Sequence, residues 1–70
     1  MGKRYEDWKP GDIVICLKDD SAQRLTLKST LFNDLYGMYF EVLSDKGIVW
    51  MVFARDLIKD TKLERALYGL

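Results

Sequence analysis

The sequence predicts one small, mainly β domain that ends in a short helix. Three observations lead to this fold class. The chain has only 70 residues, of which 49% are hydrophobic and 31% charged, which is typical of a single folded globule. Short runs rich in β-branched and aromatic residues alternate with turn signals from residue 9 to residue 59. The one clear helical pattern is confined to residues 60–70.

The first strand is expected directly after a turn. Lys9-Pro10-Gly11-Asp12 is a turn sequence, because proline presets φ and the glycine after it is conformationally free. The run from Ile13 to Leu17 is β-branched and reads as a strand. The polar residues Lys18 to Gln23 then form a loop.

The segment from Arg24 to Tyr36 is compatible with two structures. Leu25 and Leu27 alternate with polar residues, which indicates a strand. Leucine and aromatic residues between 31 and 36 also share a helical face, with Ser29 as a possible cap and Gly37 as a stop. We favour a strand followed by a turn at Asn33-Asp34, with the helix as the alternative.

A β-hairpin is the clearest local prediction. Met38 to Leu43 and Ile48 to Phe53 are the two strands, and Ser44-Asp45-Lys46-Gly47 is the turn between them. Ala54-Arg55-Asp56 breaks the pattern, and Leu57-Ile58 is a short last strand.

The tail carries the signature of a helix start. Thr61 and Glu64 form a capping box, in which each side chain accepts a hydrogen bond from a backbone N–H of the first turn. An apolar stripe follows at helical spacing, and Gly69 ends it; the stripe consists of Leu63, Ala66, Leu67 and Leu70. Because so short a helix is unstable alone, the stripe needs a surface on which to dock.

Composition argues against an enzyme, a metal site or a cofactor. There is no histidine, so the usual neutral-pH acid–base group is missing. Cys16 is the single cysteine, which excludes an internal disulfide, and its apolar strand favours a buried inert thiol. Asp12, Asp19 and Asp20 could cluster, but they lack calcium-loop spacing and read as a solvated loop.

A cytoplasmic location is expected. No apolar run reaches membrane-spanning length, no apolar signal segment follows Lys3-Arg4, and Gly2 lacks the downstream hydroxyl of a myristoylation signal. A lone thiol also fits a reducing compartment.

The order of these elements resembles a known family. Gly11-Asp12-Ile13-Val14-Ile15-Cys16, then Leu25-Thr26-Leu27, a twisted hairpin and Phe53-Ala54-Arg55 resemble small SH3-like β-barrels, particularly short ones from bacteriophages and bacteria. The resemblance implies a five-stranded barrel over residues 10–59, an N-terminal arm over 1–9 and an added helix over 60–70. The chain departs from the pattern where Lys28 or Ser29 replaces a glycine, and residues 33–37 look inserted. The resemblance also implies a binding module, such as a small regulator or inhibitor that occupies a surface of a host protein.

The hairpin has more apolar residues than one core can bury. Its strands are apolar on both faces, and a small barrel can fill its interior from one face only. The second face could be covered by the helix stripe and Trp8, or it could be a partner surface rich in aromatic residues and methionine. The expected partner-binding residues are Trp8, Tyr39, Trp50, Met51, Phe53 and Arg55.

Two other classes of partner remain open. Lys3, Arg4 and Lys9 flank Tyr5 and Trp8, and basic residues beside aromatic ones suit single-stranded nucleic acid. However, Glu6 and Asp7 lie in the same segment, and the formal net charge of the chain is zero. A structural homo-oligomer is the other alternative. We expect a non-catalytic module whose partner is another protein.

Overall fold

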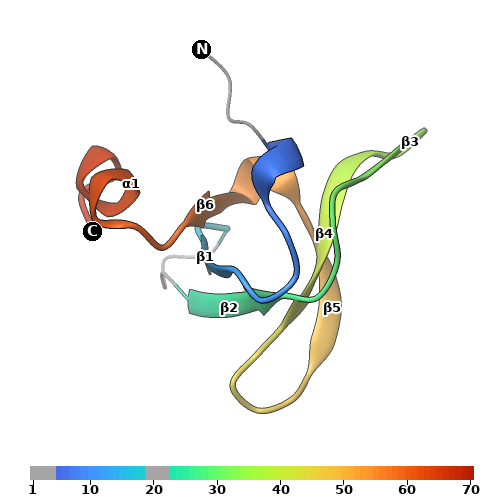
Figure 1. The fold of residues 1–70 in the computed structure, drawn as a ribbon, viewed down its shortest axis with the longest axis horizontal. Coiled ribbons are helices and arrows are strands. Elements are labelled where there is room, and N and C mark those ends of the chain that lie inside the picture. The colour runs from blue at the N-terminus through green and yellow to red at the C-terminus, as the bar shows by residue number, and fades with distance from the viewer. Residues whose placement is uncertain (1–4, 19–22) are drawn as a thin grey trace.

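The computed structural model of the protein describes residues 5–18 and 23–70. The described residues form six strands, two short 3-10 turns and one helix, which Figure 1 shows in chain order. Their bounds are Tyr5–Asp7 (3-10), β1 Ile13–Cys16, β2 Gln23–Leu27, β3 Phe32–Asp34, β4 Gly37–Leu43, β5 Val49–Phe53, Ala54–Asp56 (3-10), β6 Leu57–Lys59 and α1 Lys62–Leu67. None of the described helices is long and apolar enough to cross a membrane.

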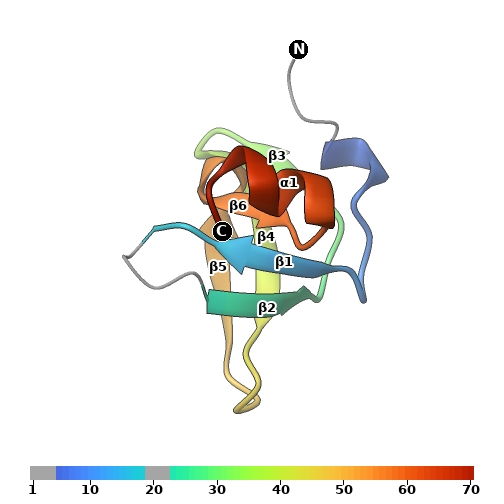
Figure 2. The ribbon, with the colours of Figure 1, turned by 90° about the vertical axis from the view of Figure 1, so that its left-hand side faces the viewer.

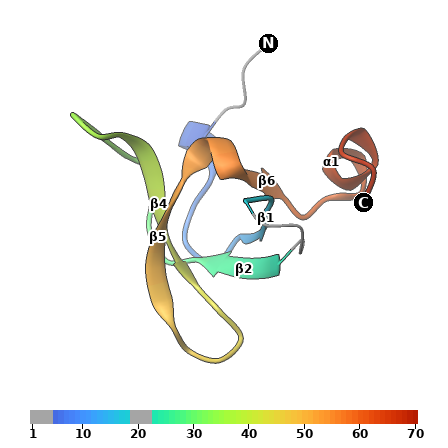
Figure 3. The ribbon, with the colours of Figure 1, turned by 180° about the vertical axis from the view of Figure 1, so that it is seen from behind.

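The strands form one antiparallel sheet that curls into a half-barrel. β1 pairs with β2 on one side and with β6 on the other. β4 links this part to the hairpin, because its C-terminal end pairs with β2 and its whole length from Tyr39 pairs with β5 (Figures 1 and 3). The mainly β prediction is therefore confirmed, with six strands in place of the expected five.

The extra strand lies in the segment that was compatible with two structures. β3 pairs with the N-terminal end of β4, with Asn33 opposite Met38 and Asp34 opposite Gly37. The helix alternative is wrong, and the turn is formed by Leu35-Tyr36 rather than by Asn33-Asp34. Gly37 has a φ of +116°, which only glycine adopts readily, so it closes this turn in place of ending a helix.

The predicted hairpin between β4 and β5 is confirmed. Its turn is held by Ser44, whose Oγ accepts hydrogen bonds from the backbone N–H groups of Lys46 and Ile48 at 3.1 and 3.2 Å. The amide of Gly47 donates to the Ser44 carbonyl at 3.1 Å. These bonds give the buried Ser44 side chain its partners and fix the register of the two strands.

The core fills the concave side of the curled sheet. Its fully buried side chains come from β1, β2, β4 and β6 and include Val14, Leu25, Leu27, Phe40, Val42 and Leu57. Trp8 from the arm completes the core, since its ring stacks on Phe40 with 5.3 Å between ring centroids and an interplanar angle of 24°. Cys16 is half-buried against this core, less deeply than the sequence suggested.

The tail helix begins as predicted but does not cover the hairpin. The Oγ1 of Thr61 accepts the Glu64 amide at 3.2 Å, whereas the Thr61 amide donates to the Lys59 carbonyl rather than to the Glu64 side chain. α1 lies beside β6 (Figure 2), at the far end of the molecule from β4 and β5 (Figures 1 and 3). Leu63 and Leu67 are 70% and 69% exposed, so these two leucines of the apolar stripe do not pack on the hairpin.

Asp60 fixes the start of the tail to the sheet. Its carboxylate forms ion pairs with Arg24 Nε at 2.8 Å and with Arg65 at 3.0 Å, and its side chain is only 9% exposed. The Asp60 amide donates to the Ile13 carbonyl at 3.0 Å. Because both ion pairs and this amide hold α1 near β1 and β6, the outer face of the hairpin stays open.

Candidate binding surface

Strand alternation divides the hairpin into an inner and an outer face. Phe40 lies opposite Val52 and Val42 opposite Trp50, and these pairs face the core. The other three cross-strand pairs point outward, namely Tyr39 with Phe53, Glu41 with Met51, and Leu43 with Val49. The outward set is apolar or aromatic apart from Glu41.

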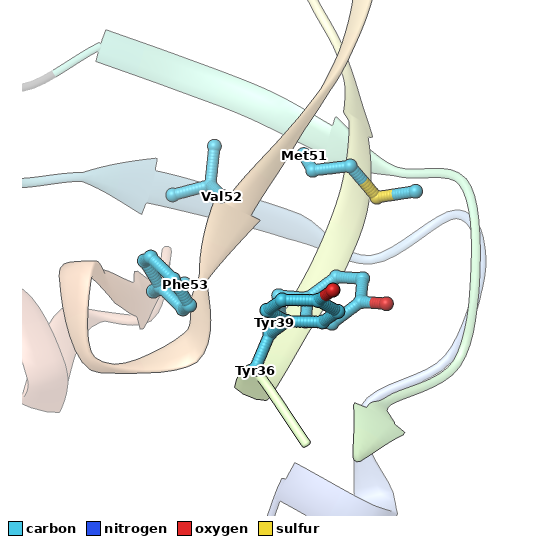
Figure 4. A pocket seen from close by; sticks show the side chains of 5 residues that line it. All are labelled: Tyr36, Tyr39, Met51, Val52 and Phe53. Atoms are coloured by element: carbon cyan, nitrogen blue, oxygen red, sulfur yellow. The ribbon is translucent and has the colours of Figure 1, made fainter. Parts of the chain in front are cut away.

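The outer face carries an open hollow near the N-terminal end of β4. It has a volume of about 280 Å³, and we call it the hairpin hollow; its lining residues are Tyr36, Tyr39, Met51, Val52 and Phe53. Figure 4 shows the two tyrosine rings and the Met51 thioether on the same side of the hairpin, with Val52 directed away from them. Tyr36 is 83% exposed and Met51 is 52% exposed, so the lining is open to contact by a partner.

Asp34 positions the two tyrosines. Its Oδ1 accepts the Tyr36 backbone N–H at 2.9 Å, which fixes the Leu35-Tyr36 turn. Its Oδ2 accepts the Tyr39 hydroxyl at 2.6 Å, and the Tyr39 ring stacks on Phe32 with centroids 5.3 Å apart. Tyr39 is therefore held by two neighbours, although it lies on the surface.

The same hydrogen bonds shift two pKa values. The bond from the Tyr39 hydroxyl, and then the one from the Tyr36 amide, lower the pKa of the Asp34 carboxyl because both favour its ionised form. The bond to Asp34 also raises the pKa of the Tyr39 hydroxyl. The rim of the hairpin hollow therefore carries a carboxylate and a neutral phenol at neutral pH.

Arg55 lies over Phe53, one of the residues that line the hollow. Its guanidinium carbon is 4.6 Å from the centroid of the Phe53 ring, which is a cation–π arrangement. The sequence suggested a local ion pair with Asp56 or a backbone clamp for Arg55, and the ring of Phe53 is the partner that the structure shows.

Three of the expected partner-binding residues are brought together, and Arg55 is beside them. Tyr39, Met51 and Phe53 line the hairpin hollow. Trp8 does not belong to this surface, because it is 5% exposed and stacked in the core. Trp50 is half-buried on the inner face and packs against the core, as strand alternation requires.

Sequence reasoning missed Tyr36 and Asp34 as parts of the site. The signal that could have found them is the spacing of Asp34 and Gly37, which flank a two-residue turn and place Tyr36 beside β4. Because the prediction placed the turn at Asn33-Asp34, it did not place Asp34 before the turn, where its side chain accepts the Tyr36 amide.

Other charged groups are placed away from the hairpin hollow or lie beyond the described residues. Lys3 and Arg4 of the basic arm, and Asp19 and Asp20 of the acidic loop, lie outside the described residues. Asp12 accepts the Lys9 amide at 3.1 Å, pairs with Lys59 at 3.2 Å, and has a lowered pKa chiefly because of the Lys9 bond. Within residues 5–18 and 23–70, no three histidine, cysteine or acidic side chains gather as metal ligands would.

The hairpin hollow, with Asp34 bonded to Tyr39 and Arg55 over Phe53, is the candidate functional site of the described chain. Comparisons with protein-family models, with curated proteins and with solved structures found no match.

Proposed function

We propose that this chain is a non-catalytic binding module that occupies a surface of a larger protein, in the manner of a small regulator or inhibitor. The observation that supports this role is the hairpin hollow. Tyrosine, phenylalanine, methionine and arginine, the residue types enriched at protein interfaces, gather around it and are open to contact.

An SH3-like barrel is the fold that we propose for the module. Three features support it: β1 pairs with both β2 and β6, a long hairpin joins β4 and β5, and a 3-10 turn links β5 to β6. The hairpin and the Phe53-Ala54-Arg55 turn before the last strand also belong to the sequence on which the resemblance rests. The fold alone would not assign a partner, so the partner class is argued from the surface.

Charge favours a protein partner over a nucleic acid. The formal net charge of the chain is zero, so the protein has no overall basic field for phosphates. The lowered pKa of Asp34 keeps a carboxylate on the rim of the hollow, where it would repel a phosphate. An apolar or aromatic side chain of a protein partner would instead fill the hollow, with neutral or basic groups toward Asp34.

The first test is a pull-down from the native host extract. Tyr36→Asp places a charge in the hollow at a position that is 83% exposed and has no part in the core. The matched control is Leu67→Asp, which places the same charge on α1 at a position that is 69% exposed. We expect wild type and Leu67→Asp to retain a protein that Tyr36→Asp loses.

The captured protein is then titrated in purified form. We expect Tyr36→Asp to weaken its affinity at least tenfold, which corresponds to about 1.4 kcal/mol. Equal affinity for Tyr36→Asp and wild type would contradict the proposal. Binding of a labelled single-stranded oligonucleotide that falls steeply with added salt would favour the nucleic-acid alternative instead.

A further inference from the structure

The free edge of β5 carries a second interaction surface. Among residues 5–18 and 23–70, β5 pairs with β4 alone, so one side of its backbone has no strand beside it. The strand sequence from Val49 to Phe53 contains no charged residue, no proline and no glycine. Natural proteins usually protect such an edge with one of these residues or with a covering element.

The register shows which backbone groups point to the free edge. The Ser44 amide donates to the Ile48 carbonyl at 2.9 Å, so this pair is hydrogen-bonded across the hairpin. Because hydrogen-bonded pairs alternate along an antiparallel ladder, Val42–Trp50 and Phe40–Val52 are the next ones. The N–H and C=O groups of Val49 and Met51, and the N–H of Phe53, therefore point to the free edge, whereas the Phe53 carbonyl belongs to the N-cap of the following 3-10 turn.

An independent contact confirms this alternation. The Glu41 carbonyl accepts the Lys28 amide at 2.8 Å, and the Glu41 amide donates to Ser29 Oγ at 3.0 Å. Both backbone groups of Glu41 thus point away from β5. Its cross-strand neighbour Met51 is consequently left with both backbone groups on the opposite, free side.

Open space lies alongside this edge. A hollow of about 350 Å³ adjoins residues 50–53 and reaches the end of β1 at Cys16 and the start of β2 at Gln23. The half-buried Trp50 is one of its lining residues. An incoming extended strand would therefore meet backbone donors and acceptors without displacing a described element.

We infer that the free edge of β5 pairs with the same edge of a second copy of this chain, in antiparallel orientation about a two-fold axis at Met51. In this register Met51 lies opposite Met51 of the copy, and Val49 lies opposite Phe53. The outward backbone groups of Val49 and Met51, and the Phe53 N–H, then find hydrogen-bonded partners, and the strand is complementary to itself.

Charge is compatible with this pairing. β5 is neutral, and the formal net charge of the chain is zero, so two copies do not repel each other strongly. The antiparallel orientation brings the β4–β5 turn of one copy, with Asp45 and Lys46, toward Arg55 and Asp56 of the other. At each end of the paired strands, one acidic and one basic residue of one copy thus lie near one acidic and one basic residue of the other copy.

This inference goes beyond the proposed function and does not depend on it. Side chains that lie opposite each other in a sheet share a face, so pairing would place the two hairpin hollows on one continuous surface. The Tyr36 position lies on the β3–β4 turn, away from the edge, so Tyr36→Asp is expected to leave the pairing intact.

Sedimentation velocity tests the association directly. The monomer mass is 8.2 kDa, and we expect the weight-average mass to rise toward twice that value between about 1 µM and about 1 mM protein. Met51→Lys is expected to remove the rise, because two lysines would lie opposite each other. A wild-type mass that stays at 8.2 kDa over the whole range would overturn the inference.

Thiol cross-linking tests the register. In a Cys16→Ala background, Met51→Cys is treated with dibromobimane, which bridges neighbouring thiols. The two Met51 positions lie about 5.5 Å apart in the paired state. The two Val49 positions lie about 14 Å apart, four residues along the strand, so Val49→Cys is the matched control.

We expect a cross-linked dimer from Met51→Cys and at least a tenfold lower yield from Val49→Cys. Equal yields from the two variants would overturn the two-fold register. Association that persists in Met51→Lys, or is lost in Tyr36→Asp, would place the contact elsewhere on the molecule. The pull-down with Tyr36→Asp is unaffected by these outcomes, so the two proposals can fail separately.

Discussion

At the scale of single residues, Asp34 fixes two parts of the candidate site. Its two carboxylate oxygens accept hydrogen bonds from different parts of the hairpin, the Tyr36 amide and the Tyr39 hydroxyl. One bond shapes the turn and the other orients a ring of the hollow. A single exposed carboxylate therefore couples the backbone conformation to the shape of the surface.

Removing the Tyr39 hydroxyl should shift the pKa of Asp34. In Tyr39→Phe, the bond that contributes most to the lowered pKa of Asp34 is lost, so we expect this pKa to rise toward the ordinary value of an aspartate carboxyl. The measurement is a carboxyl ¹³C titration by NMR. Tyr36→Phe is the control, because the Tyr36 contact uses its backbone N–H, and it should leave the Asp34 pKa unchanged.

The sign of the pH effect follows from the lowered pKa. A carboxylate whose pKa is lower in the folded state stabilises the hairpin above its unfolded-state pKa. This stabilisation is lost as the pH falls through the folded-state value. Wild type should therefore lose its β3–β4 contacts in acid, below about pH 4. Tyr39→Phe should lose the stabilisation from the Asp34 carboxylate at a higher pH than wild type does. An identical acid dependence in both proteins would contradict the role given to this bond.

At the scale of elements, the β3–β4 hairpin depends on one glycine. Gly37 has a φ of +116°, while no other residue type in the described chain has a positive φ. A Cβ at this position would lie 3.8 Å from Phe53 Cε1, which is an ordinary contact. The obstacle to substitution is therefore backbone strain rather than crowding.

Gly37→Ala should loosen this hairpin selectively. We expect a cost of about 1–3 kcal/mol, because alanine rarely adopts this conformation. Since β3 pairs with β4 alone among the described residues, amide exchange should speed up at β3 and leave β1 and β2 protected. The matched control is Leu35→Ala in the same turn, where the side chain is fully exposed and little change is expected. Uniformly faster exchange in Gly37→Ala would show that the hairpin is not an independent unit.

Most strands, but not their full connectivity, could be predicted from the sequence. The segments at residues 13–17, 38–43 and 48–53 alternate or cluster apolar residues strongly enough to identify strands. Residues 29–37 are compatible with both helical and strand spacing, and pairing with β4 decides between them. Such long-range pairing has no local signal, so β3, the extra strand of the sheet, was missed.

The tail shows the same limit. The Thr61 cap is a local interaction and was predicted correctly. The docking surface of α1 is set by Asp60, which joins Arg24 from β2 to Arg65 from the helix. That contact directs the helix to β6, and its exposed leucines remain available on the side of the molecule opposite the hairpin.

At the scale of the whole molecule, the arm is part of the core. A domain of 70 residues buries a small core, so each large buried side chain is a substantial part of its stability. Trp8 stacks on Phe40 and meets Tyr5 edge to face, with centroids 5.0 Å apart. The division into arm and barrel drawn from the sequence therefore understates how far the arm enters the fold.

Trp8→Ala should destabilise the whole domain. We expect a loss of about 3–5 kcal/mol, which is comparable to the stability that so small a core supplies, so a large fraction of the variant should be unfolded at 25 °C. Urea denaturation followed by circular dichroism measures this. Tyr36→Ala removes an aromatic ring that is 83% exposed and should change stability by less than about 0.5 kcal/mol. Similar midpoints for the two variants would contradict the placement of Trp8 in the core.

The separate environments of the two indole rings make the protein its own spectroscopic probe. Trp8 is sheltered from water, so its emission changes when the chain unfolds, whereas Trp50 borders the open side of β5 and senses what approaches there. With one tryptophan replaced by phenylalanine in turn, the remaining fluorophore would separate loss of structure from occupancy of the strand without any attached dye.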